Sequence, residues 1–269
     1  MGRQGLEVTQ RTLIMGILNI TPDSFSDGGA YLDPRRAVER ALAMVEEGAD
    51  IIDIGGESTR PRATPVSAQD EARRVIPVVR AVCRATATPV SIDTYKAEIA
   101  RMALAEGAGM LNDVWGGQRD PEMLALAAAA NVPLCLMHNR AEPRYHDLIG
   151  EIKLDLGAMV KQALSLGVRE GNIILDPGIG FGKTWRQNLV VMQRLREIVD
   201  IGFPLLVGTS RKSMIGQVLG LPVDERLEGT AATVAVSIAH GAKIVRVHDV
   251  RAMKRVARMT DALVQGGVD

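Results

Sequence analysis

Basic side chains recur in short polar segments that follow apolar stretches of the chain. The basic groups in these segments are Arg60, Arg211, Lys212, Arg246 and His248. Guanidinium, ammonium and imidazole groups donate hydrogen bonds, and their positive charge suits the negative charge of a phosphate. These residues therefore predict a site for a ligand that carries a phosphate or a diphosphate.

Acidic and amide residues stand at or near the ends of other apolar stretches, namely Asp93, Asn112 and Asp176. Carboxylates there could accept paired hydrogen bonds from the amino and ring N–H groups of a planar heterocycle. Asn19 and nearby oxygen atoms could hold Mg²⁺, which in proteins usually binds through the oxygens of a diphosphate. The residues alone indicate a polar heterocycle with a diphosphate, and they leave the reaction open.

Each of these residues also has a structural explanation when it is taken singly. Asp93 and Asp176 could be turn or helix-capping residues. Lys212 could be a solvated surface charge, and His248 could bond a backbone carbonyl. Phe25 would ordinarily be counted as a core residue, although its Ser/Asp/Gly surroundings favour contact with a ligand. The occurrence of all these residues at the ends of strands favours a functional site.

The elements that would position these residues are eight apolar stretches of strand length, each followed by a helical pattern. Nearly continuous apolar strands are typical of a parallel sheet that is covered on both faces. The expected strands are Leu13–Ile20, Asp50–Gly55, Pro89–Asp93, Met110–Val114, Pro133–His138, Ile173–Asp176, Leu205–Thr209 and Ile244–His248. Eight strands alternating with eight helices predict an α/β fold, a (β/α)8 TIM barrel with its active site at the C-terminal ends of the strands. The expected organisation is a single domain over residues 1–269.

The expected helices carry start and stop signals. Asp120-Pro121 should begin a helix that Asn131 ends, and Ser67 should cap another helix, which Pro77 should bend or shorten. A further helix, over roughly residues 228–240, is apolar nearly all round. A homodimer interface would explain that composition, and a helix shielded within one subunit is the alternative.

Bulk composition excludes several classes of protein. The 32 basic and 32 acidic residues balance, which argues against nucleic-acid and anionic-membrane surfaces. No apolar run reaches the ~18 residues of a membrane span, and the first residues lack a signal-peptide pattern. Cys83 and Cys135 are far apart and suit reduced thiols in a cytoplasmic protein.

The segment 178–184 resembles a phosphate-binding P-loop, but Pro177 stands where that motif needs glycine.

Seven segments, in order over nearly the whole chain, resemble the dihydropteroate synthases. The segments are Asn19–Gly29 (NITPDSFSDGG), Asp53–Pro61 (DIGGESTRP), Ser91–Thr94 (SIDT), Asn112–Asp113, Asp176–Lys183 (DPGIGFGK), Gly208–Ser213 (GTSRKS) and Arg246–Val250 (RVHDV). The resemblance implies a transferase that joins 6-hydroxymethyl-7,8-dihydropterin diphosphate to p-aminobenzoate. The products would be 7,8-dihydropteroate, for folate biosynthesis, and diphosphate.

The resemblance also implies a role for each matched residue. The pterin pocket would be lined by Asp93, Asn112, Met137, Asp176 and Lys212. The diphosphate would meet Asn19, Thr59, Arg60, Arg246 and His248, with Mg²⁺ bridging near Asn19. The p-aminobenzoate would lie against Phe25, Ser26, Thr59, Pro61, Lys212 and Ser213. The residues that act in catalysis would be Asp27, Asp93, Asp176, Lys212 and Arg246.

Family precedent favours a dissociative substitution, in which diphosphate leaves before the aniline nitrogen attacks a pterin methylene cation. Cationic groups and Mg²⁺ would stabilise the departing diphosphate, and carboxylates would favour the cation. Closure of the first two loops would exclude water. The segment Met137–Arg140 (MHNR) departs from the Met-His-Met of many family members, so the roles of His138 and Arg140 stay open.

Two other functions fit part of the pattern. A pterin-binding methyltransferase that passes a methyl group to a corrinoid would share the barrel, the aspartates and the asparagine. It should not need the segments SRKS and GESTRP, both of which are intact. A duplicated synthase that only binds pterin would be expected to lose residues of the first two loops, yet Asn19, Phe25, Asp27 and Arg60 are all present.

Overall fold

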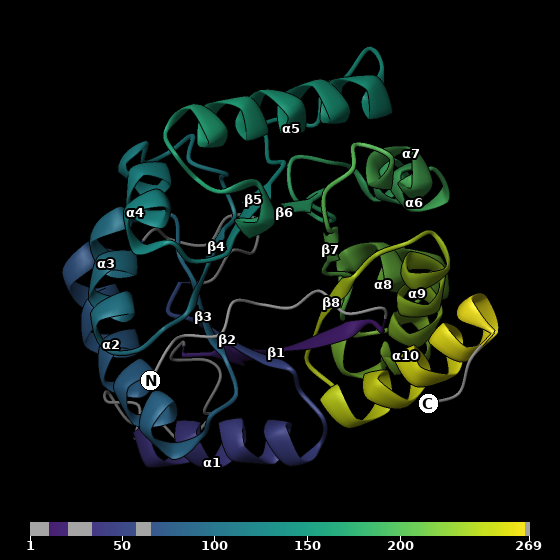
Figure 1. The fold of residues 1–269 in the computed structure, drawn as a ribbon. Helices are drawn as coiled ribbons and strands as arrows, with labels where there is room; N and C mark the ends of the chain where they lie inside the picture. Colours follow the sequence, from purple (N-terminus) through teal and green to yellow (C-terminus); the bar gives the residue numbers. More distant parts are fainter. Residues whose placement is uncertain (1–10, 21–33, 58–65, 267–269) are drawn as a thin grey trace.

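The computed structural model describes residues 11–20, 34–57 and 66–266. These residues form eight strands that alternate with helices (Figure 1). The strands are β1 (Leu13–Asn19), β2 (Ile51–Gly55), β3 (Val90–Asp93), β4 (Met110–Asp113), β5 (Leu134–Met137), β6 (Ile173–Asp176), β7 (Leu206–Val207) and β8 (Ile244–Val247). All eight expected strands are confirmed, and β7 is the one that is clearly shorter than expected.

The strands form one parallel sheet in the order β6-β5-β4-β3-β2-β1-β8-β7. A parallel bridge between Leu175 and Leu205 joins its two edge strands, and the Leu175 N–H donates to the Pro204 carbonyl at 2.9 Å. The sheet thereby closes on itself, and the helices surround it (Figure 1). The expected (β/α)8 TIM barrel is confirmed.

The described residues form ten α-helices, two more than expected. They are α1 (Pro34–Glu46), α2 (Ala68–Ala85), α3 (Ala97–Ala105), α4 (Glu122–Ala130), α5 (Leu148–Ser165), α6 (Trp185–Gln193), α7 (Leu195–Val199), α8 (Ser213–Leu219), α9 (Leu227–Ala239) and α10 (Val250–Gln265). The two additional helices arise because the connections before and after β7 each contain two helices. No helix in these ranges combines the length and apolarity that a membrane crossing requires.

The predicted helix signals act at the expected positions, with one difference. The Ser67 hydroxyl accepts the Asp70 N–H at the start of α2, and Asn131 ends α4 in the left-handed conformation with φ 52°. Pro77 lies inside α2 without shortening it, because the helix continues to Ala85. The expectation that Pro77 shortens the helix is therefore wrong, and a bend at Pro77 stays a prediction.

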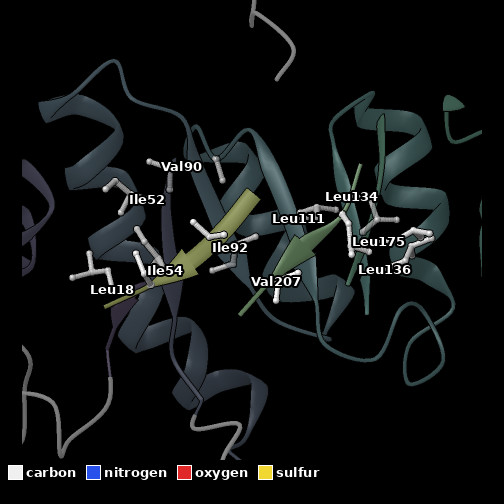
Figure 2. Packing of buried hydrophobic residues seen from close by; sticks show 14 of the residues in the cluster. Leu18, Ile52, Ile54, Val90, Ile92, Leu111, Leu134, Leu136, Leu175 and Val207 are labelled. Carbon is white, nitrogen blue, oxygen red and sulfur yellow. The ribbon is translucent and has the colours of Figure 1, made fainter. Parts of the chain in front are cut away.

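Alternation along the strands divides the apolar core into two layers. Residues that point outward from the sheet pack beneath the helices, and Figure 2 shows part of this outer layer, including Ile52, Ile92 and Leu134. Residues that point inward form a smaller cluster in the barrel, made of Leu13, Met15, Ile51, Met110, Cys135, Ile174, Leu206 and Ile244. The inner cluster fills the barrel below the strand ends, so polar side chains near those ends stand above an apolar floor.

We expect Ile244→Ala to lower the free energy of unfolding by about 2 to 5 kcal/mol, because it removes a fully buried side chain from the inner cluster. Urea unfolding followed by circular dichroism measures this loss. The control is Leu154→Ala, at an apolar side chain on α5 that is 74% exposed, where we expect a change within about 0.5 kcal/mol. Equal losses in the two variants would contradict the inner-core assignment.

Candidate active site

The barrel mouth collects polar side chains because alternate positions of neighbouring strands share one face. Asp93 pairs in register with Gly55 on β2 and with Asn112 on β4. Asp176 on β6 pairs with Met137 on β5. Side chains alternate between the two faces of a strand. Asn112 and Asp176 each stand two positions after a residue of the inner cluster, and Asp93 directly follows the outward Ile92. All three side chains therefore face the interior of the barrel.

Arg246 on β8 joins two carboxylates in the barrel. Its Nε donates to Asp53 Oδ2 at 2.6 Å, and its Nη2 donates to Asp93 Oδ2 at 2.7 Å. Asn112 Nδ2 donates to the same Asp53 oxygen at 3.0 Å. Asp53 is fully buried, and its Oδ1 has no partner within the described ranges. The site thus contains two buried carboxylates that share one guanidinium.

Asp53 was not assigned a role in the analysis of the sequence, although it begins one of the family segments. It lies in the apolar strand Ile51–Gly55, away from the strand end where functional residues were expected. A charged residue inside an otherwise apolar strand is a signal in itself, since aspartate is almost never fully buried unless it is paired. That signal could have identified Asp53.

Lys212 lies just before α8 and faces both the carboxylates and an aromatic ring. Its Nζ is 4.2 Å from the centre of the Phe181 ring. Burial and the charge of Arg246 lower the pKa of Lys212 to about 8, against the attraction of Asp176 and Asp93. Phe181 is a second residue without a predicted role, and its position in the glycine-rich segment after β6 was the available signal.

The two expected pterin carboxylates are buried at the strand ends. Burial raises the pKa of Asp93 to about 7, although the charge of Arg246 opposes the shift. Burial likewise raises the pKa of Asp176 to about 6, while its Oδ1 accepts the Gly178 N–H at 2.7 Å. Both groups therefore titrate close to neutral pH.

His248 is held as a neutral hydrogen-bond donor. The Ser210 oxygen accepts the backbone N–H of His248 at 3.2 Å and lies 2.9 Å from His248 Nδ1. The hydroxyl can then donate to Nδ1, which leaves the ring proton on Nε2. Burial lowers the pKa of His248 to about 3, and the charge of Arg246 acts in the same direction.

The guanidinium of Arg211 pairs with the carboxylate of Asp249. Nη2 donates to Asp249 Oδ1 at 2.6 Å and Nε donates to Oδ2 at 3.1 Å. The backbone of Arg211 is left-handed, with φ 58°, which is uncommon for a residue other than glycine. This ion pair ties the segment after β7 to the segment after β8.

The remaining predicted residues fall into two groups. Asn19 ends β1 beside Gly55, Met137 is buried at the end of β5, and Ser213 is exposed at the start of α8. The structure therefore brings Asp93, Asn112, Asp176, Arg246 and Lys212 together at the mouth of the barrel. The other predicted residues lie outside the described residues: Phe25, Ser26, Asp27, Thr59, Arg60 and Pro61.

The predicted magnesium site can be tested against the donors that are present. Within the described ranges no group of three or more His, Cys, Asp or Glu side chains could hold a metal ion by itself. Asp53 and Asp93 are already paired with Arg246. The neutral amide oxygen of Asn19, on the strand β1 beside β2, can serve as a metal ligand. This donor set fits an Mg²⁺ ion whose other ligands are diphosphate oxygens and water.

The family described as pterin binding enzyme matches residues 15–248. The chain belongs to this class of TIM-barrel enzymes. It is also 52% identical over 264 residues to the dihydropteroate synthase of Bacillus subtilis, a match that covers 98% of this chain and 93% of the relative.

Solved structures agree with the sequence match. A crystal structure of dihydropteroate synthase from Clostridium difficile, determined in the presence of pteroic acid, is 49% identical with a TM-score of 0.92, covering 94% of this chain and 97% of that one. The Xanthomonas albilineans synthase with 4-aminobenzoic acid is 42% identical with a TM-score of 0.90, covering 94% and 93%. Within the pterin binding enzymes, the chain belongs to the dihydropteroate synthases.

Replacing Arg246 with Met should destabilise the fold, and the loss should grow as the pH rises. Without the guanidinium, Asp53 and Asp93 lose the cation that is hydrogen-bonded to both, so the folded-state pKa of Asp93 rises further above its unfolded value of about 4. A folded pKa above the unfolded value removes stability as the pH rises through that interval. We expect urea unfolding to show a loss of about 3 to 5 kcal/mol at pH ~8 and a smaller loss at pH ~5.

The control for this variant is Arg194→Met, which removes an exposed ion pair with Glu197. Solvent screens such an exposed pair, which therefore contributes little to stability, so we expect little change in the free energy of unfolding at either pH. A loss in Arg246→Met that is the same at both pH values would contradict the buried pairing.

Proposed function

We propose that the protein condenses 6-hydroxymethyl-7,8-dihydropterin diphosphate with p-aminobenzoate to give 7,8-dihydropteroate and diphosphate. The observation that carries this proposal is the cluster of Asp93, Asp176, Lys212 and Arg246 at one end of the barrel. It places acceptors for a flat heterocycle beside cations for a diphosphate. The identity of about half of the residues with dihydropteroate synthases over nearly the full chain supports the same reaction.

In this proposal the pterin lies between the strand ends. The carboxylates of Asp93 and Asp176 accept hydrogen bonds from its amino and ring N–H groups, and Asn112 adds an amide. Met137 packs beneath the ring, and Lys212 lies at its edge. Because the carboxylates, Asn112 and Met137 project from strands, their geometry is set before the substrate binds.

The diphosphate lies where the positive charge and neutral donors collect. Arg246 supplies charge, His248 supplies its Nε2–H, and Asn19 supplies its amide. Thr59 and Arg60 complete this part of the proposed site. Mg²⁺, when bound beside Asn19, would neutralise part of the charge of the diphosphate.

The p-aminobenzoate lies nearer the surface in this proposal. Its carboxylate meets Lys212 and Ser213, which stand at the start of α8. The residues proposed to enclose its ring are Phe25, Ser26, Thr59 and Pro61, and Asp27 is proposed to act during the reaction.

The reaction begins when the bond between the pterin methylene carbon and the diphosphate oxygen breaks. Both electrons leave with the diphosphate, whose charge Arg246 and His248 stabilise, while Asp93 and Asp176 favour the cation delocalised into the pterin. The amine of p-aminobenzoate then donates its lone pair to the methylene carbon and loses a proton to solvent. An aromatic amine is nucleophilic as it stands, so no strong general base is needed.

The direct test is to mix the purified protein with Mg²⁺, the dihydropterin diphosphate and labelled p-aminobenzoate. We expect labelled dihydropteroate and one equivalent of diphosphate. A folded protein that binds pterin and forms no product would replace this proposal with a binding function. We further propose that residues 1–269 act as one domain in the cytoplasm, where the thiols of Cys83 and Cys135 stay reduced.

We expect pterin binding to weaken as the pH falls through about 7 and about 6, because protonated Asp93 and Asp176 no longer accept with both oxygens. Titration with 6-hydroxymethylpterin between pH ~8 and ~5 measures this, since that ligand carries no phosphate to titrate.

Asp93→Asn should remain folded, because Asp53 still pairs with Arg246. It should lower kcat/KM by about a hundredfold or more, and it should lose the part of the pH dependence near pH ~7. Near-normal turnover would remove Asp93 from the mechanism.

We also propose that the protein is a homodimer that buries a surface formed by α8, α9 and α10. Among the described residues thirteen large apolar side chains are exposed, and eight of them lie in this part of the chain: Val218, Leu219, Val223, Leu227, Val236, Met259, Leu263 and Val264. The three helices lie on the same side of the barrel (Figure 1). Apolar side chains gathered on one side of a protein are typical of an interface. The composition of α9, apolar nearly all round, fits this explanation.

Val236→Glu should convert the dimer to a monomer, because a charge buried in an apolar interface without a partner is costly. Light scattering after size exclusion measures the mass at several concentrations. Leu164→Glu, at an exposed position on α5 of similar exposure, is the matched control and should leave the mass unchanged. A wild-type protein that is monomeric at high concentration would contradict the proposed dimer.

A further inference from the structure

The loop between β6 and α6, residues 177–184, lies against the end of β5. Gly178, Gly180 and Gly182 all have positive φ, at 68°, 84° and 53°. A Cβ at Gly178 would overlap the carbonyl oxygen of His138, and one at Gly182 would overlap the backbone of Arg140. The glycines therefore allow a backbone approach that no other residue would permit. This loop carries Phe181, whose ring contacts the Lys212 ammonium.

Lys183 holds this loop from within. Its position resembles that of a P-loop lysine, but its ammonium turns back toward its own loop. Nζ donates to the carbonyls of Gly178 at 3.0 Å and Phe181 at 3.1 Å, and lies 2.9 Å from His138 Nδ1. An ammonium group has three protons, so these three acceptors satisfy it completely.

His138 is fully buried and accepts one of these protons, which determines its tautomer. Because the Asp155 carboxylate can only accept, Nε2 carries the ring proton and donates to Asp155 Oδ2 at 3.2 Å, and the lone pair on Nδ1 faces the Lys183 ammonium. Burial and the charge of Lys183 lower the pKa of His138 to about 3, which keeps the ring neutral. The imidazole therefore connects the loop to α5, which carries Asp155.

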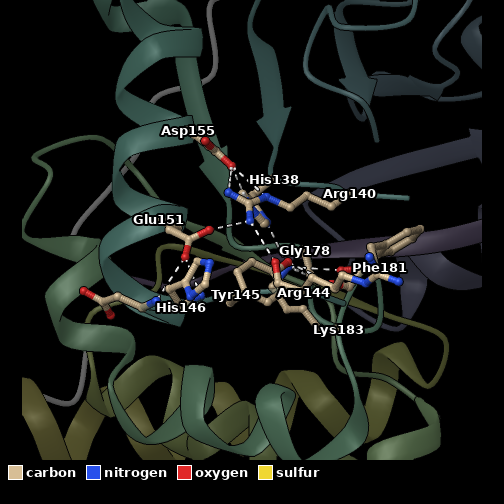
Figure 3. A network of polar contacts seen from close by, with 12 residues as sticks. His138, Arg140, Arg144, Tyr145, His146, Glu151, Asp155, Gly178, Phe181 and Lys183 are labelled. Atoms are coloured by element: carbon tan, nitrogen blue, oxygen red, sulfur yellow. Dashed lines mark hydrogen bonds and ion pairs between the residues drawn. The ribbon is translucent and has the colours of Figure 1, made fainter. Parts of the chain in front are cut away.

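The outer end of this chain of hydrogen bonds is anchored by Arg140 (Figure 3). Arg140 donates to Asp155 Oδ2 through Nε at 3.1 Å and Nη2 at 2.8 Å, and to Glu151 through Nη1 at 2.6 Å. Its guanidinium also lies 4.6 Å from the centre of the Tyr145 ring, and the Tyr145 hydroxyl donates to the Gly182 carbonyl at 2.8 Å. Side chains thus hold the carbonyls of Gly178, Phe181 and Gly182.

We propose that Lys183, acting with His138, is a positioning residue that fixes the 177–184 loop so that Phe181 stays against Lys212. This rests on the proposed function, in which Lys212 meets the carboxylate of p-aminobenzoate. The acidic groups proposed to bind pterin project from strands. Asp93 is held by Arg246, and Asp176 accepts the N–H of Gly178 at the start of the loop, so both depend less on the part of the loop that carries Phe181. Loss of the ammonium should therefore weaken p-aminobenzoate binding more than pterin binding.

The test compares Lys183→Met, which keeps the length of the side chain, with Lys161→Met at an exposed site on α5. Hydrogen exchange of the amides in residues 177–184 is measured without substrate, and steady-state kinetics are measured with both substrates. In Lys183→Met we expect faster exchange in this loop and a KM for p-aminobenzoate raised at least about tenfold. We expect kcat and the affinity for 6-hydroxymethylpterin to change less than about threefold. Lys161→Met should match the wild type.

Tyr145→Phe provides a second variant if Lys183→Met does not fold. It removes only the bond to the Gly182 carbonyl and should raise exchange and the KM for p-aminobenzoate in the same direction, by a smaller factor. Unchanged exchange and KM in the folded variants would overturn the proposal. A wild-type protein without synthase activity, together with faster exchange in the variants, would refute the proposed function and leave the loop-positioning role in place.

Discussion

The guanidinium of Arg246 makes it possible for two carboxylates to lie inside one barrel. Asp53 is fully buried and Asp93 nearly so, and an isolated buried carboxylate would be strongly destabilising. A single arginine side chain that reaches both Oδ2 atoms offsets much of that cost. The pKa of Asp93 is still raised to about 7, which shows that the charge of Arg246 does not fully offset the cost of burial. The site is therefore charged, buried and fixed in geometry before any ligand arrives.

The barrel can carry this cluster because its strands separate two tasks by alternation. Ile174 on β6 fills the inner apolar cluster, and Asp176, two residues later on the same face, reaches the mouth. Outward residues between them, such as Leu175, pack beneath the helices. Stability and chemistry thus share the same short strands without sharing positions, as is general for this fold.

A second layer of polar contacts supports the residues at the mouth. Ser210 orients the His248 ring, Asp249 holds Arg211, and Lys183 with His138 holds the loop that carries Phe181. These contacts join segments that follow different strands, so the loops around the site depend on one another. His138 and Arg140, whose roles the sequence left open, belong to this supporting layer.

The sequence by itself determined the eight strands, the helix ends at Ser67 and Asn131, and the polar residues at the strand ends, because these depend on local periodicity and capping. It also determined the family, through segments that stand in order along the chain. Only the tertiary structure decided that Asp53 pairs with Arg246, 193 residues away, and that the Lys183 ammonium turns back to its own loop. Such contacts form when the closed barrel brings distant segments together, and no pattern along the chain encodes that distance. Pro77 shows the converse, since the local sequence left open whether the helix bends or ends there, and in the structure α2 continues through Pro77 to Ala85.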